Sequence, residues 1–203
     1  MKKYVKTKNI LTVFIVIMVG ITGFAIFSKD TFVALLKHPA LYNHARFFHI
    51  AASALFFTNA VIGIIWERRS FNSGNREIIL HTYKTVTLLD SLFSSPLIIL
   101  SLLGGLSLSF NSGELWQIGW LSVSFLLFLL SGIIWIASDI PTQYRVKRLI
   151  SRLSQEDQPL PSELIRLLKL RWWIGMAGIF PLLIVFILMV YKPDITAVAE
   201  WFR

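Results

Sequence analysis

Cysteine is absent from this chain of 203 residues. Its absence excludes disulfide bonds, thiolate metal sites, CxxC redox chemistry and cysteine-ligated iron–sulfur clusters. Any metal or haem would depend on histidine, methionine, carboxylates or backbone groups. The chain also lacks a G-x-S-x-G nucleophile motif, a P-loop and a Rossmann glycine fingerprint, so it carries no common catalytic motif and we predict no catalytic residue.

Charged residues are also scarce: only 15% of the residues are charged, while 55% are hydrophobic. An ordinary soluble domain has about a quarter of its residues charged. Apolar runs recur along the whole chain and leave no stretch for a soluble domain. Since about 20 helical residues cross the roughly 30 Å apolar core of a bilayer, the sequence predicts an all-α, multi-pass transmembrane helical bundle.

Five spans are predicted, at residues 9–27, 47–66, 86–108, 115–138 and 172–191, and Pro96 predicts a kink in the third. Residues 1–28 form an N-terminal membrane anchor, and residues 29–203 form a four-span core with an outer loop at 29–46 and a basic cytoplasmic loop at 139–171. The first apolar run is longer than the roughly 7–15 residues of a signal-peptide core and lacks an A-x-A cleavage pattern. We therefore expect this span to be retained.

Acidic residues are outnumbered, with 11 Asp and Glu against 20 Lys and Arg. The basic residues lie in short segments beside apolar spans, and an inside N-terminus places most of them in the cytoplasm. The pattern predicts a bacterial inner-membrane protein with its N-terminus in and its C-terminus out. The expected partners are anionic lipid headgroups, and a membrane-protein complex or homo-oligomer, rather than nucleic acid.

Helical spacing sorts the polar residues of two spans into stripes of small and polar side chains. The stripe of the second span is His49, Ser53, Phe56, Ala60, Gly63 and Glu67, and that of the third is Asp90, Ser94, Leu97, Ser101, Gly104 and Leu108. Small residues let helices approach closely, and a carboxylate avoids acyl chains. These two faces are predicted to pack against each other.

Asp90 is a candidate functional residue because an ionisable group inside a span is costly unless it is paired or used. We expect it to pin the bundle near Glu67 and Ser94, paired with Arg68, Arg69 or Lys84. The alternative is that Asp90 lines a polar path in a small oligomeric transporter.

His49 is predicted to be a hydrogen-bonded interior group about one turn from the outer end of its span. The alternative is a ligand of haem b or copper. With His38 and His44 of the adjoining outer loop it would form a three-histidine site for copper or zinc.

Several segments also resemble a known family by order and spacing. Residues 88–96 with 104–106 resemble its ADWLFT-x-P…G-x-x-L segment, and residues 46–50 resemble its K-x-x-H-I segment. Residues 130–135 with Pro141 and Gln143 are similar to LSG-x-x-W…P-x-Q, and residues 189–193 to MV-x-KP. The family is the uncharacterised bacterial membrane family described as domain of unknown function 2269.

This resemblance implies an inner-membrane protein with a four-helix core and no agreed activity. The chain departs from the family pattern by its additional first span and by Ser91, where the family often has tryptophan. The segment around His49 is also loosely similar to CopD-type copper proteins and to HemJ, a haem-dependent oxidase. HemJ-type chemistry uses a second axial ligand, and the lysine candidate, Lys84, is predicted at the opposite membrane face.

Together these observations predict a non-enzymatic integral inner-membrane protein, acting as an accessory, assembly or interaction subunit. A redox or metal-handling protein that uses His49 and a small transporter that uses Asp90 are the alternatives.

Overall fold

A computed structural model describes residues 7–113, 115–151 and 160–201, and all of its regular elements in these ranges are helices. In chain order they are α1 (Thr7–Phe27), α2 (Lys29–Leu36), η1 (Pro39–Leu41), α3 (Tyr42–Asn72), α4 (Arg76–Leu89), η2 (Asp90–Ser94), α5 (Ser95–Ser112), α6 (Gly119–Ile134), η3 (Trp135–Asp139), α7 (Ile140–Ser151), α8 (Ser162–Tyr191) and η4 (Val198–Glu200). The predicted all-helical fold is confirmed.

Four continuous helical stretches are long and apolar enough to cross a membrane, and we call them rods. They are α3 with η1, α4 through α5, α6 through α7, and α8. Each has 30 to 37 residues, so at 1.5 Å per residue each is about 45–55 Å long and extends beyond the bilayer core. Helix α1 meets the same criterion only together with α2, which is bent from it by 105°. The five-span prediction therefore agrees with the structure when this bent pair counts as one span.

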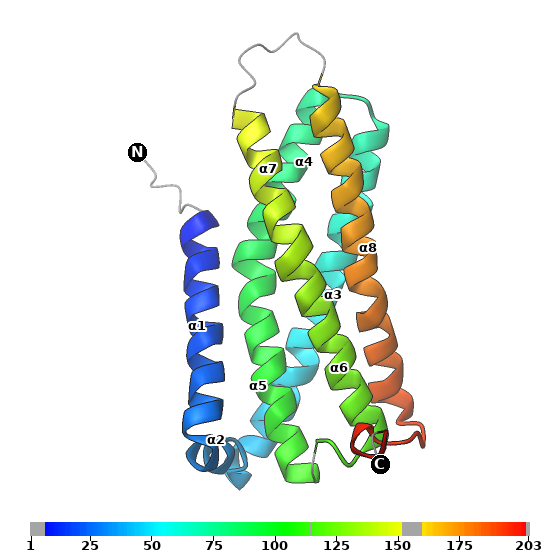
Figure 1. The fold of residues 1–203 in the computed structure, drawn as a ribbon. Coiled ribbons are helices and arrows are strands. Elements are labelled where there is room, and N and C mark those ends of the chain that lie inside the picture. Colours follow the sequence, from blue (N-terminus) through cyan, green and yellow to red (C-terminus); the bar gives the residue numbers. More distant parts are fainter. Residues whose placement is uncertain (1–6, 114, 152–159, 202–203) are drawn as a thin grey trace.

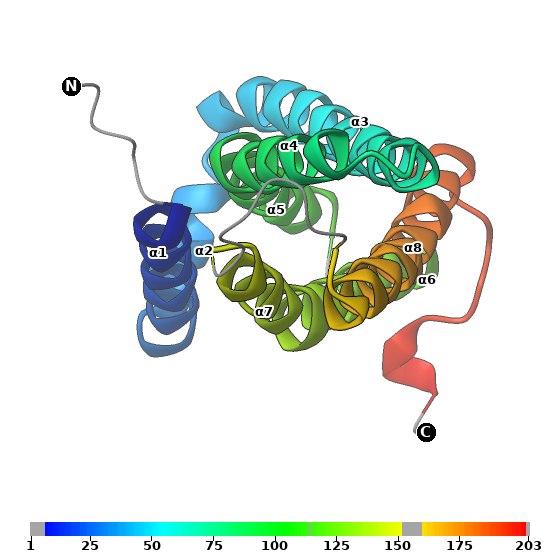
Figure 2. The ribbon, with the colours of Figure 1, turned by 90° about the horizontal axis from the view of Figure 1, so that it is seen from above.

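The rods form two layers, which Figure 2 shows in projection. Helix α3 packs mainly against α5, and α6 packs mainly against α8. Helix α1 stands beside the gap between the layers and contacts α5 and η2. Its Phe14 packs edge-to-face on Trp135 of η3, with ring centroids 5.6 Å apart. Helix α1 is thus a side wall of the bundle.

The predicted packing of the second and third spans is confirmed by close contacts between α3 and α5. Gly104 lies so close to α3 that a Cβ atom there would stand 2.8 Å from the Ala45 carbonyl oxygen. The hydroxyls of Ser53 and Ser101 are 2.6 Å apart, and the Asn59 amide donates to the Ser94 hydroxyl at 2.9 Å. Small residues and hydrogen bonds therefore hold these two helices together.

The distribution of side chains is that of a protein surrounded by lipid. Apolar residues face outward, as shown by Val190, which is 71% exposed. The interior instead holds many small hydroxyl side chains: Ser94, Ser95, Ser101, Ser107, Ser109, Ser122, Ser124 and Ser131. Two of them donate to a backbone carbonyl of another helix, Ser107 to Leu36 at 2.6 Å and Ser131 to Gly178 at 2.7 Å. Packing of small residues replaces the large apolar core of a soluble protein.

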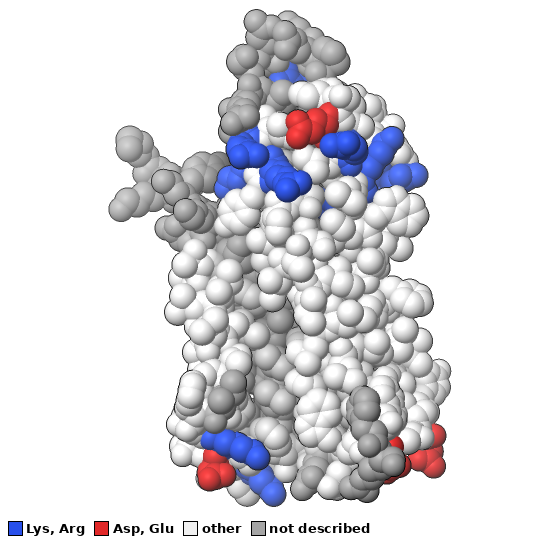
Figure 3. All heavy atoms as spheres, viewed as in Figure 1, with Lys and Arg blue, Asp and Glu red and all other residues white. Residues whose placement is uncertain are grey.

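Lysine and arginine gather at one end of the rods, with an uncharged band between the two ends (Figure 3). This basic end contains the last turns of α3 and α7 and the first turns of α4 and α8. The N-terminal end of α1 lies on the same side (Figure 1). The N-terminal end of α1 and the basic connections thus lie on one side of the bundle, as the sequence predicts.

Two π-helical turns interrupt the rods, and each precedes a proline. Turn η2 ends one residue before Ser95, which is followed by Pro96, and turn η3 ends one residue before Ile140, which is followed by Pro141. Proline has no N–H and its ring collides with a carbonyl of the preceding α-helical turn. A wider turn relieves that collision. The sequence predicts a kink at Pro96, and the structure instead has a π turn at residues 90–94, just before the proline.

Candidate functional site

Arg171 is a deeply buried charged side chain, with only 4% of the residue exposed. It lies nine residues inside α8, on the stripe that includes the buried Leu164 and Leu167. Helical spacing of three and four residues places all three on one face. The guanidinium is thereby directed between the two layers of the bundle.

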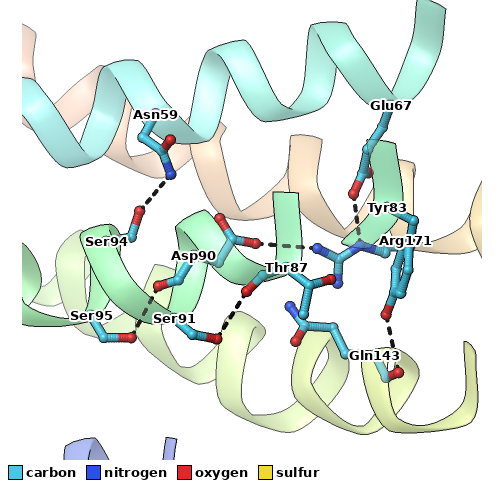
Figure 4. Close-up of polar contacts among 10 residues, drawn as sticks. All are labelled: Asn59, Glu67, Tyr83, Thr87, Asp90, Ser91, Ser94, Ser95, Gln143 and Arg171. Carbon is cyan, nitrogen blue, oxygen red and sulfur yellow. Dashed lines mark hydrogen bonds and ion pairs between the residues drawn. The ribbon is translucent and has the colours of Figure 1, made fainter. Parts of the chain in front are cut away.

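Two carboxylates from two other rods bind this guanidinium (Figure 4). Arg171 Nε donates to Glu67 Oε1 of α3 at 2.9 Å, and Arg171 Nη2 donates to Asp90 Oδ2 of η2 at 3.3 Å. The Glu67 and Asp90 side chains are 15% and 20% exposed. Arg171 thus joins three separate rods. We call Glu67, Asp90 and Arg171 the charged cluster.

Tyr83 also lies against Arg171. Its ring centroid lies 5.4 Å from the guanidinium carbon, and its hydroxyl donates to the Gln143 carbonyl oxygen of α7 at 3.1 Å (Figure 4). A cation over an aromatic face is stabilised by the ring quadrupole. Through Tyr83, the fourth rod is connected to the charged cluster.

The π turn η2 places Asp90 at this position. Its backbone carbonyl accepts the Ser95 N–H, five residues along, and also the Ser95 hydroxyl at 3.1 Å. Four residues beyond Asp90, the Ser94 hydroxyl accepts the Asn59 hydrogen bond from α3. The π turn therefore directs the Asp90 carboxylate at Arg171 while Ser94, at its other end, packs on α3. Such turns are frequent at functional sites.

A cavity of about 460 Å³ lies between the layers and ends at the charged cluster. Its walls are apolar residues of all four rods and of α1, among them Phe14, Phe56, Leu102, Phe128 and Leu182. Glu67, Asp90 and Arg171 are its charged lining residues. The volume falls within the roughly 300–1,000 Å³ of ligand-binding pockets. We call this cavity the chamber.

The predicted partner of Asp90 was wrong. The structure pairs it with Arg171, whereas Arg68 lies over the ring of Trp172, 5.2 Å from its centroid. The sequence places Arg171 in the basic cytoplasmic connection 139–171, whereas in the structure it lies on the buried face of α8, nine residues after the helix begins at Ser162. A signal existed in the sequence, since Arg171 continues the apolar stripe of Leu164 and Leu167.

His49 is half-buried and hydrogen-bonded, in agreement with its predicted interior position. Its Nδ1 lies 2.7 Å from the Ser101 carbonyl oxygen, and because a carbonyl only accepts, Nδ1 carries the proton. Its ring lies against Gly105, where a Cβ atom would stand 2.9 Å from Cε1. In the neutral ring, Nε2 would be the nitrogen available to a metal.

The structure does not assemble the predicted three-histidine metal site from His38, His44 and His49. Within residues 7–113, 115–151 and 160–201, no three His, Asp or Glu side chains are grouped so that they could hold a metal ion. His38 Nδ1 instead accepts the N–H of Ala40 at 3.3 Å and caps the start of η1. This local capping bond occupies Nδ1 of His38 and leaves Nε2 as the ring nitrogen open to a metal.

Lys84 lies far from His49, as predicted. Val86, two residues from Lys84, contacts the position of Gly63 on α3. Gly63 is fourteen residues from His49 along that helix, which corresponds to roughly 21 Å. The pair is therefore not arranged to hold the two axial positions of one haem.

One protein family matches the chain, and it is described as "predicted integral membrane protein (DUF2269)". The match covers residues 43–193 and therefore begins in α3 and ends after α8. It includes the whole charged cluster but not α1. Neither the curated proteins nor the solved structures provide a significant match. Since the matched region is well over half of the 203 residues, the chain belongs to this family of integral membrane proteins.

Proposed function

We propose that this protein is a non-enzymatic accessory subunit in a bacterial inner membrane. It would bind an amphipathic, membrane-soluble molecule in its chamber. The observation that carries the proposal is the composition of the chamber, which has apolar walls along its length and the charged cluster at one end. Such a space suits a long apolar chain with a single polar head. The head would lie beside Glu67, Asp90 and Arg171.

The charges indicate which head groups fit. Arg171 already donates to two carboxylates, so the cluster does not offer an uncompensated positive charge to an anion. The carboxylates accept hydrogen bonds and attract cations. A neutral hydroxyl or a primary amine is therefore favoured over a carboxylate or phosphate head.

The basic end of the bundle supports a cytoplasmic location for that end and hence an N-terminus inside the cell. Positively charged residues are enriched in cytoplasmic segments of membrane proteins, and Lys and Arg gather at this end in Figure 3. In this orientation the charged cluster lies near the cytoplasmic boundary, and the chamber extends from it toward the middle of the membrane.

A series of C16 molecules tests the proposal. The purified protein in detergent is titrated with hexadecanol, hexadecylamine and palmitate, and the complexes are measured by native mass spectrometry. We expect the alcohol and the amine to bind at one molecule per chain and palmitate to bind more weakly. Equal weak binding of all three, without a defined stoichiometry, would contradict the proposal.

A pair of glycine variants provides the control. Gly132 lines the chamber, and a Cβ atom there would meet nothing within 4 Å, so Gly132→Leu fills space without displacing the backbone. Gly20 has the same freedom but lies on α1 outside the chamber lining. Gly132→Leu should weaken binding, while Gly20→Leu should not. Equal effects of the two variants would place the bound molecule elsewhere.

A further inference from the structure

A second cavity lies at the basic end, between α3, α4 and α8. Its volume is about 250 Å³, and it is lined by Glu67, Arg68, Ser70, Phe71, Ile79, Tyr83, Leu168, Lys169, Trp172 and Trp173. Glu67 lines both this cavity and the chamber. The two cavities therefore adjoin at Glu67 of the charged cluster, and we call the smaller one the interfacial pocket.

Two cations of the interfacial pocket are held by aromatic rings rather than by carboxylates. The Arg68 guanidinium lies 5.2 Å from the ring centroid of Trp172, and Lys169 Nζ lies 5.5 Å from that of Phe71. In the described part of the chain neither has an ion-pair partner. Cation–π contacts orient these side chains but leave their N–H donors unused. The pocket therefore has two positioned cations on α3 and α8.

A third donor is the indole N–H of Trp172. This nitrogen is buried, and it has no hydrogen-bond acceptor within the described ranges. An unpaired buried donor is costly, so such a group commonly indicates a missing partner. The one carboxylate that lines the pocket, Glu67, accepts a hydrogen bond from Arg171. An acceptor from outside the protein would supply this missing partner beside the two cations.

We infer that the interfacial pocket binds the phosphate of an anionic lipid headgroup. Arg68 and Lys169 would supply the charge, and Trp172 Nε1–H would donate a directed hydrogen bond. A lipid is favoured over a soluble phosphate because apolar side chains surround this site at the membrane boundary. Trp173 of the pocket is 66% exposed, and Leu170 and Ile78 are each 48% exposed. Glu67 lines both cavities, but Arg68, Lys169 and Trp172 do not line the chamber, so this inference does not depend on the ligand proposed there.

Binding of dioctanoyl phosphatidylglycerol to the full chain in detergent tests this inference. Arg68→Gln and Lys169→Gln should each weaken binding about tenfold, as expected for the loss of a charge-assisted hydrogen bond. The matched controls are Lys84→Gln and Arg145→Gln, which remove exposed cations outside the pocket lining. These should leave the affinity within about twofold, because neither side chain lines the pocket. Equal losses in all four variants would reduce the effect to net charge and overturn the site.

The tryptophan pair distinguishes a directed hydrogen bond from general packing. Trp172→Phe removes the N–H and keeps an aromatic ring, and Trp173→Phe removes the corresponding group from the exposed neighbour. We expect weaker binding for the first variant only. An unchanged affinity for Trp172→Phe, with folding verified by circular dichroism, would contradict the predicted donor.

Two further ligands identify the source of the phosphate. Dioctanoyl phosphatidylcholine, which has no net charge, should bind more weakly than phosphatidylglycerol, and inorganic phosphate should bind more weakly still. Competition by inorganic phosphate at the same concentration as the lipid would assign the pocket to a soluble anion and overturn the lipid assignment.

Discussion

Replacing Arg171 by methionine should destabilise the protein more than any neutralisation of a single exposed cation. The variant keeps a long, flexible, apolar stem and removes the positive charge shared by Glu67 and Asp90. Breaking a buried ion pair costs about 3–5 kcal/mol, because the remaining charge is left unpaired. Since the two carboxylates keep 15% and 20% of their exposure, we expect the lower end of this range, about 3 kcal/mol.

A triple variant separates the charge from the packing. Adding Glu67→Gln and Asp90→Asn to Arg171→Met removes both unpaired carboxylates at nearly constant volume. The triple variant should recover most of the loss, because replacing a whole buried ionic group is far less costly than breaking it. Asp90→Asn alone should cost less than Asp90→Leu, with about 1–3 kcal/mol for the latter, since asparagine keeps a hydrogen-bond acceptor for Arg171.

The free energy of unfolding is measured by titrating the protein in mixed micelles with sodium dodecyl sulfate and following helicity by circular dichroism. Two results would refute the structural role of the charged cluster. One is an Arg171→Met stability within about 0.5 kcal/mol of the wild type. The other is a triple variant no more stable than Arg171→Met alone.

Two further predictions concern helix packing and topology. Gly104→Ala should destabilise the protein by about 1–3 kcal/mol, because the new methyl group meets the backbone of α3, whereas Gly20→Ala in open space should be neutral or slightly stabilising; the same unfolding titration compares them, and equal stabilities would contradict the close approach. Reporter fusions after Ser28, Ser73, Ser112, Ser154 and Arg203 should lie outside, inside, outside, inside and outside in turn, and a cytoplasmic reporter at Arg203 would exclude the proposed orientation.

The spans and their pairing could be predicted from the sequence because both depend on local patterns. Apolar length identifies the rods, and the spacing of His49, Ser53 and Ser101 identifies the faces that meet. The structure confirms these faces by the contacts of His49 and Ser53 with Ser101. Hydrophobicity and helical period were sufficient at this level.

The charged cluster could be predicted only in part. Asp90 and Glu67 were expected at the inner ends of neighbouring spans, but their shared partner is 81 residues from one and 104 from the other. Which helix contributes the cation depends on how the layers are arranged, and local spacing does not encode this. The chamber was not predicted for the same reason, since its walls come from all four rods and from α1.

The π turns η2 and η3 change how the rods α4–α5 and α6–α7 should be aligned with other sequences. Such a turn contains about one residue more than an α-helical turn, so the residues after it are rotated by about 100° relative to an uninterrupted helix. Deleting one residue within 90–94 would restore a regular helix and turn the whole serine- and glycine-rich face of α5 away from α3. A single-residue gap in these turns is therefore a change of the buried face, and it should not be treated as a harmless loop deletion.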